Sequence, residues 1–280
     1  MKRHLLIIGF ILAACPLFLN GQAGKCGTRV SDAQVAVENL ISINSVKANE
    51  SVPLLNVELL VNVYIVLDTL KNPGIAVATV DAALTKLNNA FSAIKLKFHR
   101  CNLTYIENYQ FNVISTATAD SNLYVQNHIP NAINLYFVSG IYDSGSGSVA
   151  GYTFMPGDAR DAIFLTKETA TGNEIIHQFG HFFGLYHTHE IIFGKELVKD
   201  PNCKTNGDRC CDTPADPGIS GMIDKDCEYT GSLQDANKQY YVPTTQNMMS
   251  LGNDACRCCF TNDQLNRVVY YVTNKKKHLW

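Results

Sequence analysis

The feature that most restricts the fold of this chain is the run 173–187, which places three histidines at fixed spacing. His177 and His181 are four residues apart, so on a helix both imidazoles leave the same face, one turn apart. Gly184 follows three residues later, where a glycine can adopt the left-handed conformation that ends a helix. The chain then turns, and we expect His187 to complete a set of three nitrogen ligands. Three protein ligands leave the fourth position of a tetrahedral zinc open, which is typical of a catalytic site.

This run resembles the elongated zinc signature HExxHxxGxxH of the metzincin peptidases, except at one position. Gln178 stands where these enzymes have a glutamate. In the family, that glutamate takes a proton from the zinc-bound water and passes it to the leaving amine. A carboxamide does not accept this proton at any ordinary pH. The resemblance therefore implies the architecture of a zinc peptidase that lacks its general base.

Three further stretches follow the zinc-binding run in an order that is typical of one metzincin family. They are 207–216, the Asn-Met-Met-Ser sequence at 247–250, and 256–268. Together they resemble the pappalysin (cytophagalysin) family, and the similarity extends from about Asn56 to about Val268. It implies an α/β (α+β) fold in which a twisted mixed sheet and the zinc helix form the N-terminal lobe. A disulfide-rich, irregular C-terminal lobe then carries the Met-turn.

The resemblance also indicates which residues support the site. Met249 is expected to be the Met-turn methionine, which packs beneath the zinc histidines together with the turn at Gly184; the alternative is an ordinary core methionine. Leu251 stands where the family has a tyrosine that is thought to steady the oxyanion. The loss of two groups that act on one transition state favours natural loss of function. Glu174 and Glu190 remain nearby, but helix geometry directs neither at the zinc-bound water.

The first residues have the pattern of a secretory signal peptide, with a basic start and an apolar run from Leu5 to Leu19. This run is too short for a stable membrane span. An alternative is a bacterial lipoprotein signal acylated at Cys15, which the following proline disfavours. We expect a signal peptide over 1–22, a pro-like segment over 23–55, an N-terminal lobe over 56–187 and a C-terminal lobe over 188–280. The mature protein is expected to be secreted or extracytoplasmic.

Export determines how the ten cysteines are interpreted, because oxidising compartments favour disulfides. Loss of Cys15 leaves nine, and an odd number requires one free thiol, which we expect to be Cys26. The other eight are expected to form four disulfides of unknown connectivity: Cys101, Cys203, Cys210, Cys211, Cys227, Cys256, Cys258 and Cys259. Export and the lack of paired CxxC spacing also argue against a zinc ribbon at 256–259.

Cys26 begins a Cys-Gly-Thr sequence that resembles one near the N-terminus of pappalysins. In latent members of that family, such a cysteine is thought to occupy the open zinc position until its segment is removed. A thiolate is a suitable fourth ligand and displaces the reactive water. The alternative is a disulfide from Cys26 to Cys101 or to a partner protein.

Alternating strands and helices are predicted between these features. We expect a short helix around 35–43, strands at 56–68, 96–105, 132–138, 149–154 and 162–166, and a loop over 143–148. A longer helix is expected to begin with Thr79 as its cap. Its apolar stripe comprises Val80, Leu84, Leu87, Phe91 and Ile94.

By resemblance, Gly151, Tyr152 and Thr153 lie on the edge strand that binds substrate. An exposed edge binds an extended peptide as one more strand, so the expected partner is an extended peptide or protein in the cleft. The alternative is an edge strand without a binding role. A hydrophobic content of 46% supports one sizeable core, and a net charge of −2 gives no reason to expect a nucleic-acid partner.

Zinc is the expected cofactor. Asp208, Asp212 and Asp216 are also candidate ligands for calcium, which some family members use, although loop carboxylates often only form turns. Three functional hypotheses follow: an exported zinc pseudopeptidase that binds peptide, a slow metalloendopeptidase with another base, and a secreted structural or interaction module.

Overall fold

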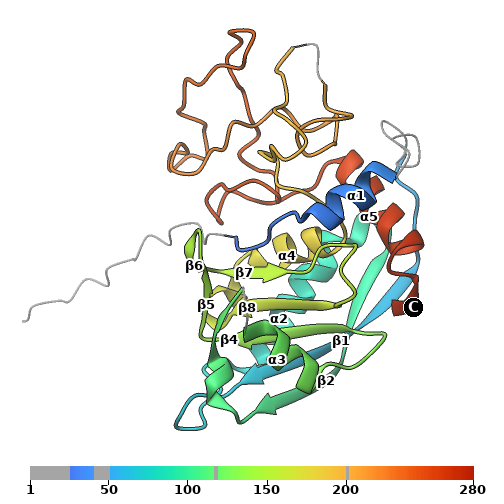
Figure 1. Ribbon diagram of the computed structural model, residues 1–280, viewed down its shortest axis with the longest axis vertical. Helices are drawn as coiled ribbons and strands as arrows, with labels where there is room; N and C mark the ends of the chain where they lie inside the picture. The colour runs from blue at the N-terminus through green and yellow to red at the C-terminus, as the bar shows by residue number, and fades with distance from the viewer. Residues whose placement is uncertain (1–25, 41–50, 117–118, 200–201) are drawn as a thin grey trace, which may run out of the picture.

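The computed structural model describes residues 26–40, 51–116, 119–199 and 202–280. The predicted signal peptide, including Cys15, lies outside these residues, as do 23–25 and 41–50 of the pro-like segment. Within the described ranges, every helix is too short or too polar to cross a membrane. Helices and strands alternate along the first two thirds of the chain, which confirms the predicted α/β class (Figure 1).

A five-stranded sheet with the order β2-β1-β4-β8-β7 forms the centre of the molecule. The parallel strands are β1 (Val57–Val66), β2 (Leu96–Ile106), β4 (Ile133–Val138) and β8 (Ala162–Thr166). The last strand, β7 (Gly151–Thr153), is antiparallel to β8 and forms one edge. β4 and β8 are buried at every position, as expected for strands covered on both faces. The strands predicted at 56–68, 96–105, 132–138 and 162–166 are confirmed.

The helix α2 (Val77–Ala90) connects β1 to β2, because parallel neighbours need a crossover. The prediction that Thr79 caps this helix is wrong. Ala76 is the N-cap residue, and its side chain makes no capping bond. The amide of Thr79 already donates to the carbonyl of Ala76, so Thr79 belongs to the first turn. All five residues of the predicted apolar stripe are buried, but α2 carries only three of them, because Phe91 is its C-cap and Ile94 lies in the 3-10 helix that follows.

A second, smaller sheet corrects two predictions. It contains β3 (Val113–Ser115), β5 (Gly140–Asp143) and β6 (Gly147–Val149), and it is accompanied by α3 (Ala119–Asn127). Only 144–146 of the predicted loop over 143–148 form a turn, because Asp143 ends β5 and Gly147, with a positive φ of 77°, begins β6 of the same hairpin. The strand predicted over 149–154 is divided, because Val149 ends β6 whereas Gly151 begins β7 in the other sheet.

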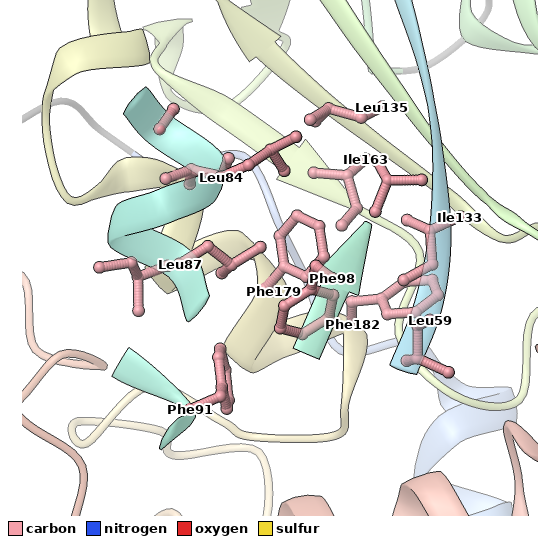
Figure 2. Packing of buried hydrophobic residues seen from close by; sticks show 14 of the residues in the cluster. Leu59, Leu84, Leu87, Phe91, Phe98, Ile133, Leu135, Ile163, Phe179 and Phe182 are labelled. Carbon is pink, nitrogen blue, oxygen red and sulfur yellow. The ribbon is translucent and has the colours of Figure 1, made fainter. Parts of the chain in front are cut away.

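One face of the large sheet is covered by α2 and by α4 (Glu174–Phe182), which carries two of the three histidines. Figure 2 shows Phe179 and Phe182 of α4 in the same cluster as Phe98 of β2. The rings of Phe98 and Phe179 meet edge to face with centroids 4.9 Å apart. Each such side chain contributes roughly 1.5–3 kcal/mol when fully buried. This packing fixes the rotation of α4 and leaves His177 and His181 on another side of the helix.

Four stacked aromatic rings cross the opposite face of the sheet. Tyr64, Tyr136, Phe164 and Tyr152 occupy matching positions on β1, β4, β8 and β7. Their successive centroids are 4.7, 4.8 and 4.7 Å apart. Aromatic cross-strand pairs of this kind stabilise a sheet. The stack therefore ties the short edge strand β7 to the interior of the sheet.

The C-terminal lobe is largely irregular between 188 and 260, and disulfides connect parts of it. The described cysteines form three disulfides, Cys203–Cys211, Cys227–Cys256 and Cys258–Cys259. The expectation of four is wrong, because Cys101 and Cys210 are free. Cys101 is exposed on β2, where its thiol donates to the Asn62 side chain, whereas Cys210 is buried in the C-terminal lobe.

Two helices lie side by side above the sheet (Figure 1). α5 (Asn262–Asn274), which was not predicted, begins with a capping box in which Thr261 and Gln264 bond each other's amides. This Thr-x-x-Gln signal is present in the sequence. Leu265 and Val268 bring α5 into the core that also holds α4. α1 (Asp32–Leu40) matches the predicted short helix, of which 41–43 lie outside the described residues.

Candidate metal centre

The three histidines of the zinc-binding run converge on one point. His177 and His181 leave α4 one turn apart, and the chain reverses at Gly184, whose φ is +85°. A residue with a side chain would be strained there. After this turn, His187 returns to the site. The Nε2 atom of His181 lies 3.1 Å from the Nε2 atoms of both other histidines.

Hydrogen bonds at the far side of two rings set their tautomers. His177 Nδ1 lies 2.8 Å from the carbonyl oxygen of Met248, and His181 Nδ1 lies 2.8 Å from that of Leu185. A carbonyl only accepts, so each Nδ1 carries the proton and each Nε2 presents a lone pair. Two lone pairs facing each other at 3.1 Å repel unless a cation lies between them. Met248 was not predicted to have this role, and no local signal in the sequence reveals it.

These residues fit a zinc ion. A tetrahedral ion with bonds of ~2.0–2.1 Å holds its nitrogen ligands ~3.3–3.4 Å apart, close to the spacing found. Burial, together with the neighbouring imidazoles, lowers the pKa values of His177 and His187 well below the usual range. Burial also lowers the pKa of His181 to about 4. All three rings are therefore neutral at physiological pH, which is the form that binds a metal.

Cys26 lies at the same point. Its Sγ atom is 3.5 Å from His181 Nε2, and its sulfur and the three histidine nitrogens all lie within 4.8 Å of one another. The Thr28 amide and the Gln178 side chain donate to this sulfur over 3.3 and 3.2 Å. Burial, and then the charge of Glu174, raise the pKa of the Cys26 thiol to about 12. A thiolate at this position therefore requires a cation beside it.

Gln178 is fully buried, and both ends of its amide are bonded. Its Oε1 accepts from the Thr28 hydroxyl, and its Nε2 donates to Glu174 Oε1, each over 2.8 Å. Glu174 also pairs with buried Arg257 at 3.4 Å. Burial raises the pKa of Glu174, while the charge of Arg257 opposes this shift. Thr28, Glu174 and Arg257 thus form a network around the glutamine that the sequence did not reveal.

The other nearby carboxylate, Glu190, does not join this network. Its Oε1 accepts from the backbone amides of Ile191 and Ile192, next to it in the chain. This local bonding holds its carboxylate in the loop that follows His187.

Met249 lies in the turn 247–250 and is fully buried against α4. A Cβ atom added to Gly180 would lie only 2.5 Å from the Met249 sulfur, so the helix and the turn are in close contact there. The Asn247 side chain accepts from the Met249 amide and exchanges two hydrogen bonds with Gln264 of α5. The turn therefore rests on α5 and supports the helix that bears the histidines.

The edge strand β7 is paired with the chain's own N-terminal segment. Gly27 donates its amide to the Gly151 carbonyl over 2.9 Å, and Cys26 forms a parallel bridge with Gly151. The Thr153 amide donates to the Thr28 hydroxyl over 3.0 Å. Tyr152, between them, has its side chain in the aromatic stack of the opposite face. Residues 26–28 therefore occupy the edge at which the sequence analysis placed a substrate.

The three candidate calcium ligands bond to separate partners. Asp208 accepts from Cys210 and Thr213, and Asp212 accepts from the Asp263 amide. Asp216 bonds the Thr188 hydroxyl and the Gly218 amide. In the described part of the chain, the only group of three or more suitable ligands consists of Cys26 and the three histidines. The expected calcium site receives no support from this arrangement.

Curated relatives of the chain are named extracellular metalloproteases. One from Neurospora crassa is 25% identical over 270 residues, which covers 88% of this chain and 87% of the relative. One from Pyricularia oryzae is 28% identical over 153 residues, or 49% of this chain and 46% of the relative. The match therefore spans about half the length of the Pyricularia relative.

Two solved structures are also similar. Myroilysin has a TM-score of 0.34 and 14% identity, with 80% of this chain and 97% of that chain covered. Archaemetzincin from Methanopyrus kandleri has a TM-score of 0.33 and 15% identity, and the match covers 46% of this chain and 76% of that chain. The family model for peptidase M43, described as pregnancy-associated plasma protein-A, matches residues 121–273, more than half of the 280 residues. This chain therefore belongs to the pappalysin family of metallopeptidases.

Proposed function

We propose that this protein is an exported zinc pseudopeptidase that has kept the metal centre and the peptide-binding edge of its family but lost the proton transfer. His177, His181 and His187 would hold the zinc, and Cys26 would complete its coordination while the N-terminal segment is in place. An extended peptide or protein would pair with β7 after residues 26–28 leave. The relatives named extracellular metalloproteases support the export of this chain.

The bonding of Gln178 carries this proposal. A general base needs a free lone pair directed at the reacting water, and an amide nitrogen has none to offer. The amide nitrogen of Gln178 instead donates to Glu174, one turn earlier on α4. A glutamate at position 178 would place an oxygen where Glu174 now accepts a hydrogen bond, so the contact with Glu174 favours glutamine. This match favours a natural substitution over an introduced one.

The residues of the site keep the tasks that do not need a base. A bound zinc would lower the pKa of a coordinated water to about 7. The carbonyls of Met248 and Leu185 hold the imidazoles of His177 and His181 in the tautomer that binds metal. Leu251 has no donor for an oxyanion. Loss of a general base costs roughly 10²–10⁴-fold, and loss of an oxyanion donor a further 10²–10³-fold.

The test is a peptide-cleavage assay on four proteins: the natural sequence, Gln178→Glu, Leu251→Tyr and the double variant. Each is measured before and after removal of residues up to 55, with bound zinc determined in parallel. We expect the natural sequence to cleave at least roughly a hundredfold more slowly than the double variant at equal zinc content. If the natural protein has the same kcat/KM as Gln178→Glu and as the double variant, the pseudopeptidase proposal is excluded and another residue is the base.

A further inference from the structure

The N-terminal segment is held at a second place, in the helix α1 that follows Cys26. Glu38 of α1 is 3% exposed, and its carboxylate enters a pocket formed by residues of the peptidase domain. Arg267 lies 2.7 Å from Glu38 Oε2, and the Tyr271 hydroxyl donates to the same oxygen over 2.6 Å. The Tyr186 hydroxyl donates over 3.2 Å, and Arg209 lies 3.6 Å from Oε1. α1 lies beside α5 in Figure 1, as these contacts require.

Contacts other than those with Glu38 also hold the pocket in place. Arg267 is 2% exposed, and its Nε donates to the Gly184 carbonyl over 2.6 Å. Its guanidinium lies over the rings of Tyr186 and Tyr271, at 4.7 and 5.3 Å from their centroids. Arg267 thus also bonds the turn that joins the second and third histidines. The pocket therefore belongs to the framework of the metal centre.

The charges of the pocket require an anion. Burial alone would raise the pKa of Glu38, but the charge of Arg267 and the Tyr271 hydrogen bond lower it below the usual range. Glu38 is therefore ionised and its charge compensates that of Arg267. Without Glu38, a guanidinium would remain buried next to hydroxyls and aromatic rings, which is strongly unfavourable. A carboxylate is the ligand that matches this donor set.

We infer that the pocket of Arg267, Tyr271, Tyr186 and Arg209 is a carboxylate-binding site, and that Glu38 is its built-in ligand. Glu38 thereby anchors α1 and keeps Cys26 and Thr28 at the metal centre. This deepens the proposed function, since it rests on the N-terminal segment as a cover of the site. The segment is held at both ends of 26–38: the Cys26 thiol lies at the histidines, and the Glu38 carboxylate lies in the pocket around Arg267.

The first experiment measures the rate at which Cys26 of the full mature chain is alkylated, followed by peptide mapping. We expect Glu38→Gln to accelerate labelling by at least about tenfold. Tyr271→Phe, which removes only a hydroxyl, should give a smaller acceleration, and the double variant should equal Glu38→Gln because both act on one contact. Asp32→Asn, on the exposed start of the same helix, is the matched control and should label at the natural rate.

The second experiment tests the pocket directly with acetate as the probe. In Glu38→Ala, sodium acetate should raise the Tm saturably by about 2–4 °C above sodium chloride at equal ionic strength, and the natural protein should show no such rise. Natural-rate labelling of Glu38→Gln, or an absent acetate effect in folded Glu38→Ala, overturns the inference. If Glu38→Gln does not fold, the labelling rate of Tyr271→Phe and the acetate titration of Glu38→Ala test the inference instead.

The two proposals fail in different ways. If Cys26 is not a zinc ligand, its labelling rate will not depend on zinc, while the acetate effect remains. If Glu38 is not an anchor, the labelling rate will depend on zinc in every variant, and none will differ from the natural protein.

Discussion

The contact between Gln178 and Glu174 allows a quantitative prediction for the variant Gln178→Glu. In the natural protein, the amide nitrogen of Gln178 donates to Glu174 Oε1 over 2.8 Å, and both side chains are buried. The substitution replaces that donor by a carboxyl oxygen of almost the same shape. Two ionised carboxylates this close repel strongly, so one of them must keep a proton. Glu174 already has a raised pKa, chiefly because of its burial.

The sign and size of the effect follow from proton binding. The folded variant holds a proton that the unfolded chain loses above its pKa of about 4.3. Its free energy of unfolding therefore falls as the pH rises, by about 1.4 kcal/mol for each pH unit until the folded pair ionises. The loss cannot exceed the cost of forcing a buried unpaired charge, about 3–5 kcal/mol. Below pH ~4.3 the two proteins should differ little.

Urea unfolding at several pH values and one fixed free zinc concentration measures the free energy of unfolding of Gln178→Glu and of the natural protein. Glu174→Gln combined with Gln178→Glu is the matched control, because it keeps one amide and one carboxyl at the same contact. We expect this double variant to recover most of the free energy of unfolding that Gln178→Glu loses, because the two side chains are in contact and their effects are not additive. The reasoning is refuted if Gln178→Glu shows the natural stability at pH 8 and the same pH dependence as the natural protein.

Three further predictions concern the metal centre. Purified protein should contain close to one zinc per chain by elemental analysis, and His181→Ala should lose it; a folded protein that refuses zinc would contradict the site. Mass mapping of the alkylated, non-reduced protein should find Cys26 free, and Cys26 in a disulfide would end its proposed role at the metal. Gly180→Ala should lower the free energy of unfolding by up to about 2 kcal/mol, because overpacking against the Met249 sulfur, roughly 1–3 kcal/mol, outweighs a helix-propensity gain of about 1 kcal/mol. A urea midpoint of Gly180→Ala above the natural midpoint would show that this contact relaxes without cost.

Local periodicity was sufficient to predict several elements. The spacing of His177, His181, Gly184 and His187 identified the ligand helix and the turn after it, because residues within one or two helical turns are brought together by backbone geometry alone. Buried strands such as 162–166 were also identified, because a short apolar run bounded by turn residues is typical of a buried strand. The capping signal of α5 was present but was overlooked in a stretch dominated by cysteines.

The partners of these residues depended on contacts that are distant in sequence. Glu38 and Tyr271 are 233 residues apart, and Thr28 and Gln178 are 150 apart, yet each pair is hydrogen-bonded. Cysteine pairing likewise depended on which thiols the fold brings together, and Cys101 remains unpaired on β2. The sequence by itself determined a three-histidine site with glutamine in place of the base. Only the tertiary structure decided what surrounds that glutamine and what holds the N-terminal segment, because burial and pairing of charges arise from the packing of the whole chain.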